Sequence, residues 1–490
     1  MIKRSSNNLR ARFGLARRRL QRRLAGTMYS IRAGGIRSVS SILENARRLQ
    51  RRLAGTMYSI RARGIRSVSS ILGNARRLWL QVFGRRETVE EQNNWNLYQD
   101  VVWFGVLSGI TSTFVSVFAI RLGASNTLVG LLVSLPALIS IFWLIPSARI
   151  IERRRRRLPI IVLAGFLQRL GYLLIALMPF VFHVYRPEAL VGLVALITFP
   201  TAIASVAFTS LIAEVVPADK RAQVISIRSV LAAIVSTVTV LISGKLLDLL
   251  LFPFNYQLLF GAGFAASLVS LYYVSRIKVA DAIVADQALR RKTPLTVRLR
   301  RSVQQLMNQR DFVRFSASAF VFQWGLYLPT ALYAIYRIKN LGASDTWIGL
   351  LSMAQSAVTI VAYFYWGRVA SRRGNRLVLL ISSLGVVLYP VLTGLSLRIE
   401  PLLLASVVGG IFGAGFNLSF FNTLLEVCPQ ERRPSFVALH TTLINVAAFL
   451  APLLGTSLAN LLDIRVVFFI AGAVRLLGAG VFYRLIVRKH

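Results

Sequence analysis

Two stretches of this chain are near copies of each other, and they constrain the fold more than any other feature. Leu122–Leu132 reads LGASNTLVGLL, and 219 positions later Leu341–Leu351 reads LGASDTWIGLL. A second pair follows in the same order at an offset of 212, with EVVPADKR at Glu214–Arg221 and EVCPQERR at Glu426–Arg433. Two shared sites at nearly one offset predict a chain made of two homologous halves.

The composition places both halves in a membrane. Of the 490 residues 55% are hydrophobic and 16% are charged, against about 25% charged in a typical soluble protein. We predict an all-α integral membrane protein with twelve transmembrane helices in two pseudo-symmetric six-helix bundles, because lipid offers no partner to an unpaired backbone group. Each apolar segment is long enough for the roughly 20 residues that a bilayer requires. The predicted spans are 98–120, 126–147, 159–182, 189–213, 223–247, 255–275, 313–336, 345–367, 376–397, 401–425, 436–460 and 465–486.

Basic residues alternate from loop to loop along these spans. The loop after the second span carries Arg153–Arg157, and those after the fourth, sixth, eighth and tenth spans are also basic. Loops on the other side are short and hold one or two cations each. The positive-inside rule then predicts that both termini are cytoplasmic and that the protein is a multi-pass protein of the plasma or inner membrane.

Residues 1–86 form a separate basic tail with an internal repeat of 29 residues. Gln21–Ala46 and Gln50–Ala75 differ at two positions, and the tail holds 22 Lys or Arg against one acid, Glu44. It fits an amphipathic segment on anionic lipid, and slightly better a disordered basic extension, because its glycines weaken a continuous helix. Aromatic residues that could stack on bases are few, so we expect no nucleic acid partner. The predicted domains are 1–86, a first bundle at 95–277, a basic linker at 278–311 and a second bundle at 312–490.

The loops after the second and eighth spans align at the 219 offset, and the second copy reads GRVASRRGNR. This resembles G-x-x-x-D-R-x-G-R-R, the signature loop of the major facilitator superfamily, whose members are transporters. In that family the loop acts as a cytoplasmic latch. The acid position is Glu152 in the first copy and Ser371 in the second, so the resemblance implies an asymmetric latch. The alternative is that these arginines only fix topology. The residues implied for this gate are Glu152, Arg153, Gly367, Arg372, Gly374 and Arg376.

Four ionisable residues lie inside predicted spans, where charge is expensive and often functional. Arg169 and Arg475 fall at the middle of the third and twelfth spans, which are peripheral in the resembled fold; this favours a structural role over contact with a solute. Arg228 and His440 are equivalent at the 212 offset, near the cytoplasmic ends of the fifth and eleventh spans. Gating or snorkelling is expected for both, and His440 is also a candidate for proton coupling, with a hydrogen-bonded packing role as the alternative.

The resemblance also implies a central cavity lined by the first, fourth, seventh and tenth helices. The candidate substrate residues there carry indole, phenol and amide groups: Trp103, Gln323, Trp324, Tyr327, Asn417 and Asn422. For Asn417, a role in helix packing alone is the alternative. Because no carboxylate falls at the middle of a predicted span, the sequence disfavours a carboxylate proton relay.

These features predict a secondary active or facilitative transporter that moves a small solute by alternating access. The chain contains no phosphate-binding P-loop and no catalytic or metal-ligand cluster, so we expect neither an enzyme nor a cofactor. The expected partners are a small-molecule solute and membrane lipids, and we expect a monomer. A non-transporting sensor or scaffold with a lipid- or partner-binding tail is the alternative.

Overall fold

A computed structural model describes residues 88–152, 158–182, 184–217, 219–279, 309–429 and 433–484. The predictions for the tail at 1–86 and for most of the linker at 278–311 lie outside these ranges. All regular secondary structure in the described ranges is helical. The first half contains α3 (Val89–Arg121), α4 (Asn126–Glu152), α5 (Leu158–Val181), α6 (Arg186–Val215), α7 (Arg221–Leu249) and α8 (Phe254–Ser275).

The second half begins with a span that is broken into three pieces, α10 (Arg310–Tyr327), α11 (Thr330–Ile335) and the π-helix η3 (Tyr336–Asn340). It continues with α12 (Asp345–Arg373), α13 (Asn375–Leu395), α14 (Leu402–Val427), α15 (Arg433–Leu461) and α16 (Ile464–Phe482). Eleven helices of the described ranges can cross a membrane by length and composition. The seventh span is the exception because Pro329 interrupts it and α10 begins with charged residues.

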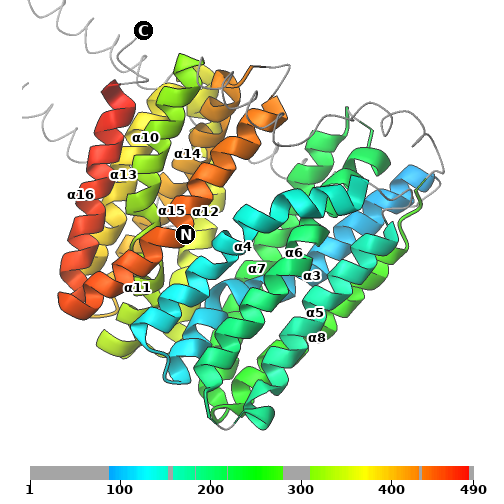
Figure 1. Ribbon diagram of the computed structural model, residues 1–490, viewed down its shortest axis with the longest axis horizontal. Helices are drawn as coiled ribbons and strands as arrows, with labels where there is room; N and C mark the ends of the chain where they lie inside the picture. The colour runs from blue at the N-terminus through cyan, green and yellow to red at the C-terminus, as the bar shows by residue number, and fades with distance from the viewer. Residues whose placement is uncertain are drawn as a thin grey trace, which may run out of the picture. The chain divides into compact units, whose positions relative to one another are not determined.

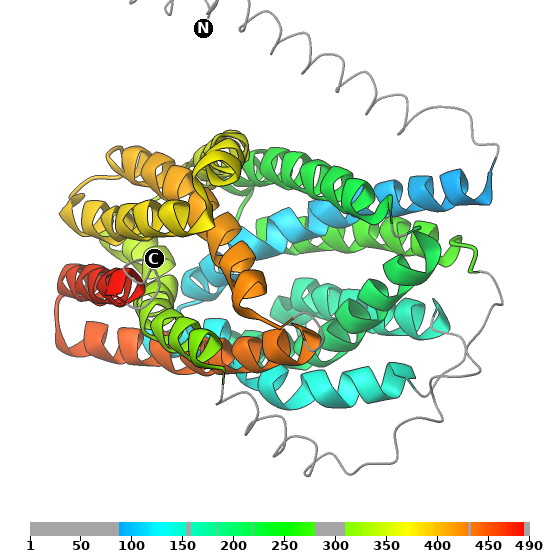
Figure 2. The ribbon, with the colours of Figure 1, turned by 90° about the horizontal axis from the view of Figure 1, so that it is seen from above.

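The helices form the two predicted bundles, α3 to α8 and α10 to α16 (Figures 1 and 2). Within the first, α3 packs on α7 and α8, and α5 packs on α6 and α8. Within the second, α13 packs on α14 and α16, and α10 on α16. Across the bundles α4 packs on α15 and α7 on α12. The prediction of two pseudo-symmetric six-helix bundles is therefore confirmed.

The repeated sequence forms the turn that enters α4 and the turn that enters α12. Gly123 and Gly342 have φ of +91° and +62°, a conformation that favours glycine. Ser125 and Ser344 follow, and each hydroxyl accepts a hydrogen bond from the backbone N–H three residues later, a helix N-cap. We call the end of the bundles that carries these turns the turn face, and the opposite end, where α4 and α12 end, the loop face.

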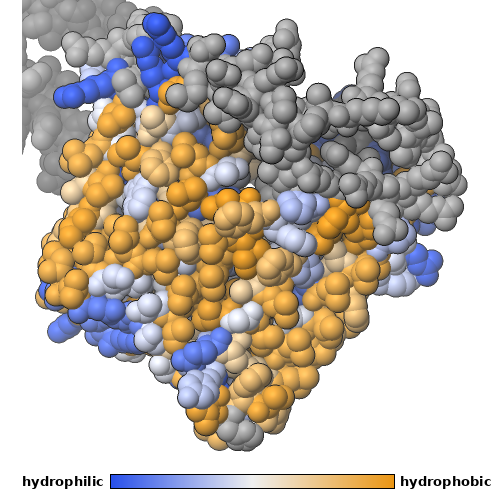
Figure 3. All heavy atoms as spheres, viewed as in Figure 1, coloured by the Kyte–Doolittle hydropathy of each residue, from blue (hydrophilic) through white to orange (hydrophobic). Residues whose placement is uncertain are grey.

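The outer surface of the bundles is apolar. Figure 3 shows hydrophobic side chains over most of one face, with smaller hydrophilic patches mainly toward its ends. Large side chains such as Phe142, Phe180 and Phe364 are more than 60% exposed. Such a surface is stable in lipid and not in water, so the exposed band agrees with helices that cross a membrane.

Candidate functional site

A buried ion pair joins α3 and α7 inside the first bundle. Arg228 Nη2 lies 2.9 Å from Asp100 Oδ2, and the same guanidinium donates to the carbonyl of Leu97. The ring of Phe208 lies 4.7 Å from the guanidinium carbon. The Arg228 side chain therefore lies within the bundle and does not snorkel to the membrane surface.

Arg169 extends this pair into a network. Its three nitrogens donate to the carbonyls of Ser267 and Gly165 and to the hydroxyl of Ser270, at 2.7 to 2.9 Å. The Ser270 hydroxyl in turn donates to Asp100 Oδ1 at 2.7 Å. Two arginines and one carboxylate thus tie α3, α5, α7 and α8 together. With every nitrogen of Arg169 engaged, this geometry agrees with a structural role.

Arg475 on α16 completes the broken seventh span. Proline has no N–H, so Pro329 cannot donate to the carbonyl four residues earlier, that of Gly325. Arg475 Nε donates to this carbonyl at 2.9 Å. Its other nitrogens donate to the Val386 carbonyl at 2.9 Å and to the Tyr333 hydroxyl at 3.2 Å. The side chain is 1% exposed, and it replaces the backbone hydrogen bond that the proline removes.

His440 occupies the position in the second bundle that Arg228 has in the first. Its Nδ1 lies 3.1 Å from the Ser316 hydroxyl, and the rings of Phe315 and Phe420 each lie 5.6 Å away. Nε2 is buried and has no hydrogen-bond partner among the described residues. The position equivalent to Asp100 is Ala319, so the second bundle places an alanine where the first has its acid.

The six cavity candidates differ in exposure. Trp103 is 37% exposed and Asn417 is exposed, whereas Trp324 and Tyr327 are half-buried. Gln323 is 9% exposed. Asn422 donates to Asn375 Oδ1 at 3.2 Å, which joins α14 to the start of α13 within one bundle.

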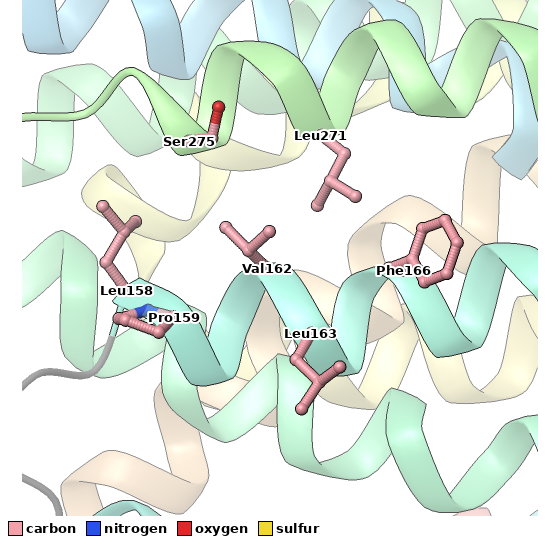
Figure 4. Close-up of a pocket in the computed structure, with 7 residues that line it drawn as sticks. All are labelled: Leu158, Pro159, Val162, Leu163, Phe166, Leu271 and Ser275. Carbon is pink, nitrogen blue, oxygen red and sulfur yellow. The ribbon is translucent and has the colours of Figure 1, made fainter.

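A shallow pocket of about 500 Å³ lies on the outside of the first bundle, away from the cavity candidates (Figure 4). Its walls are Leu158, Pro159, Val162, Leu163 and Phe166 of α5 with Leu271 and Ser275 of α8. Leu163 is 60% exposed and Phe166 41%. None of the cavity candidates lines it, and its apolar, outward-facing walls suit lipid chains.

The second signature loop is a tight turn between α12 and α13. Gly374 has φ +85° and ψ 155°, and its N–H donates to the Ala370 carbonyl at 2.9 Å. Ser371 is exposed and its hydroxyl donates to the Arg368 carbonyl at 3.0 Å. Arg372 is exposed, while Gly367 and Arg376 are half-buried.

The first signature loop lies largely outside the described residues, including Arg153 and the side chain of Glu152. A neighbouring loop-face contact is described: Lys220, in the first E-V-x-P segment, lies 2.8 Å from Glu90 at the start of α3. This hydrogen-bonded carboxylate raises the pKa of Lys220 above its ordinary value.

Sequence reasoning missed the partners of these charges. Asp100 is 5% exposed inside α3, although hydropathy placed it near a span end. The spacing of Gly325 and Pro329 was a usable signal, because a proline always leaves the carbonyl four residues earlier without its helical partner.

The chain folds into two bundles of six membrane helices that are related by an internal repeat, and alternate loops between the helices are basic. A large class of membrane proteins has this architecture. The family model for the Major Facilitator Superfamily matches residues 101–337 and 315–490, and the two matches together cover both halves. The chain belongs to this superfamily, which confirms the resemblance of the signature loops.

Curated relatives align with part of the chain. The multidrug resistance protein MdtG of Proteus mirabilis is 30% identical over 137 residues, 28% of this chain and 34% of the relative. MdtG of Dickeya zeae is 34% identical over 138 residues, 28% of this chain and 33% of that protein. The chain thus spans about a third of the length of these relatives.

Solved structures of the same fold match over most of the chain. The nucleoside transporter NupG superimposes with a TM-score of 0.61 at 13% identity, over 82% of this chain and 100% of that one. A D-xylose–proton symporter gives a TM-score of 0.62 at 15% identity, over 80% and 97%. At these identities the likeness concerns the fold alone.

Proposed function

We propose that the protein is a secondary active or facilitative transporter that moves a small solute across the membrane by alternating access. The observation that carries this proposal is the contact between two pseudo-symmetric bundles at the turn face, through α4 with α15 and α7 with α12. Bundles related by a repeat can rock about a central site and expose it to one side at a time.

The solute is proposed to be neutral, amphiphilic or anionic. Trp103 and Asn417 present an exposed indole and amide. The buried arginines Arg169 and Arg475 have their nitrogens engaged by protein groups, and the carboxylate of Asp100 is paired with Arg228. Aromatic and amide groups orient a ligand without placing a free charge in the membrane. The relatives named as multidrug resistance proteins are compatible with an amphiphilic solute.

The loop face is proposed to be cytoplasmic, with both termini on that side of a plasma or inner membrane. The five consecutive arginines Arg153–Arg157 and the exposed Arg372 and Arg373 support this orientation by the positive-inside rule. Glu152 and Arg153 in one loop, and Gly367, Arg372, Gly374 and Arg376 in the other, would then form the cytoplasmic gate.

The basic tail is proposed to bind anionic lipid at the same membrane surface, where each cation adds about 1 kcal/mol of attraction. The support is its charge, 22 basic residues against one acid within 1–86. Binding to anionic liposomes should weaken sharply between low and high salt. Binding that ignores salt would refute electrostatic attachment.

Transport is tested by flux in proteoliposomes. The purified protein is reconstituted, and uptake is measured for a panel of labelled neutral, amphiphilic and anionic solutes with and without a proton gradient. We expect saturable uptake of at least one solute by the proteoliposomes and no such uptake by protein-free liposomes.

The alternative is a non-transporting sensor or scaffold of the same fold, which the loss of the latch acid at Ser371 favours. Absence of flux across the panel, together with a cellular phenotype that depends on residues 1–86, would support that alternative and contradict transport.

A further inference from the structure

The two repeated turns contact the opposite bundle in the same way. Arg121 Nη2, at the end of α3, donates to the Ala343 carbonyl at 2.9 Å. Lys339 Nζ, in η3, donates to the Ala124 carbonyl at 2.9 Å. Ala124 and Ala343 occupy equivalent positions of the repeat, so each turn offers the same carbonyl oxygen to a cation from the other half.

The glycines of the repeat allow the helices behind these turns to approach closely. A Cβ on Gly349 of α12 would lie 2.9 Å from the Val240 carbonyl and 3.6 Å from Gly244 on α7. A Cβ on Gly130 of α4 would lie 2.5 Å from Thr456 Oγ1 on α15. Gly244 and Thr456 are themselves equivalent at the 212 offset. The repeat therefore lies within the contact surface between the bundles.

One member of this surface carries a charge that its counterpart lacks. Asp248, at the end of α7, accepts hydrogen bonds from the backbone N–H of Asp345 at 3.0 Å and of Thr346 at 2.9 Å. These N–H groups belong to the first turn of α12. The N–H groups of a first turn have no intrahelical partners, and the positive end of the helix dipole there attracts an anion. The position equivalent to Asp248 is Asn460, which accepts from the side-chain amide of Asn126 at 2.9 Å.

Asp345 reinforces the same contact from the other bundle. It is 5% exposed, accepts a hydrogen bond from the Tyr256 hydroxyl at 2.9 Å and lies 3.6 Å from Arg121. Asp345 is thus buried as long as the bundles touch, whereas Thr346 is half-buried and the Asp248 side chain lies at the exposed edge of the contact. Opening the turn face would separate the Asp248 carboxylate from the two N–H groups of α12, which would then hydrogen-bond to water alone.

We propose that Asp248 is a positioning residue that holds the turn face closed by capping α12 across the bundle interface. It sets the ratio of molecules closed at this face to molecules open there. Without the carboxylate, the closed state loses two hydrogen bonds across the interface that the open state does not have, so the ratio falls. The inference rests on the proposed alternating-access function. It names the residue that shifts the equilibrium between the closed and the open turn face.

The test measures distances across both faces by electron–electron double resonance in reconstituted protein. Cys428 is first replaced by serine. One pair of spin labels replaces the exposed Leu251 and Leu397 at the turn face, and a second pair replaces the exposed Gln223 and Ser371 at the loop face.

In Asp248→Ala the ratio of short to long turn-face distances should fall about tenfold, the effect of losing one or two hydrogen bonds between membrane helices. Asp248→Asn keeps one oxygen and loses the charge, so its ratio should lie between that of the natural protein and that of Asp248→Ala. Asn460→Asp should raise the ratio, because a carboxylate there would face the amide of Asn126 near Lys339 Nζ, which lies 3.2 Å from Asn126 Oδ1.

Asp463→Ala is the matched control. Asp463 also caps a helix at the turn face, since its side chain accepts from the Arg465 N–H at 2.8 Å, but this contact stays within one bundle. It should leave the ratio unchanged.

Two outcomes separate the inference from the function beneath it. Two distance populations that Asp248→Ala does not shift, or that Asp463→Ala shifts equally, would overturn the role of Asp248 alone. A single distance at each face in every variant would overturn both that role and alternating access.

Discussion

Replacing Arg475 by methionine tests the claim that this arginine completes the broken seventh span. Methionine is long and apolar but donates no hydrogen bond. The Gly325 and Val386 carbonyls and the Tyr333 hydroxyl would each lose a donor. The variant should therefore unfold more easily than the natural protein.

The size of the loss follows from these contacts. Hydrogen bonds between membrane helices average about 0.6 kcal/mol each, so three bonds amount to about 2 kcal/mol. Pro329→Ala restores the N–H that the Gly325 carbonyl lacks. In that background Arg475→Met should cost less, by roughly 0.6 to 1.7 kcal/mol. Pro329→Ala alone should change little, since Gly325 already has a partner.

The assay is the free energy of unfolding of the four proteins in mixed micelles titrated with denaturing detergent. The double-mutant cycle isolates the coupling between the two residues. Leu476→Ala, at a lipid-exposed neighbour on α16, controls for side-chain truncation. Equal costs of Arg475→Met with proline and with alanine at position 329 would refute the reasoning.

Three further predictions concern other contacts. Asp100→Asn should destabilise the protein by about 3 kcal/mol because it leaves Arg228 buried without its acid, and adding Arg228→Met should recover part of this in the same unfolding assay. Gly130→Ala should lower the short turn-face distance population, because its Cβ meets Thr456 Oγ1 at 2.5 Å, and Thr456→Gly should suppress the effect in the resonance measurement. Gly374→Ala should cost about 1 to 3 kcal/mol of unfolding free energy, because φ +85° with ψ 155° is essentially confined to glycine; an unchanged stability would contradict this.

The sequence predicted most of the fold because lipid imposes helices and the repeat imposes two halves. It placed the start of the first helix at residue 98, whereas α3 begins at Val89. Thr88 and Glu91 form a capping box there, and Asn93 bonds the backbone at Lys278. Because these polar turns carry no apolar signal, hydropathy placed Asp100 near a span end, although it lies within the helix.

The charged residues of the site could be predicted from the sequence, but their hydrogen-bond partners could not. Arg169, Arg228 and Arg475 stood out as charges in apolar segments, but which atoms they bond depends on helix rotation and on contacts 89 to 150 positions apart in sequence. The repeated turn likewise indicated topology, while its contact with the other bundle required the packing of α4 on α15 and α7 on α12.

Alternating access is tested most directly by the accessibility of the cavity candidates from the two sides of the membrane. A single cysteine is placed at Trp103 or Asn417 in a Cys428→Ser background, and vesicles of both orientations are treated with a membrane-impermeant thiol reagent. The account predicts that the same position reacts from either side. Reaction from one side only, at both positions, would contradict it.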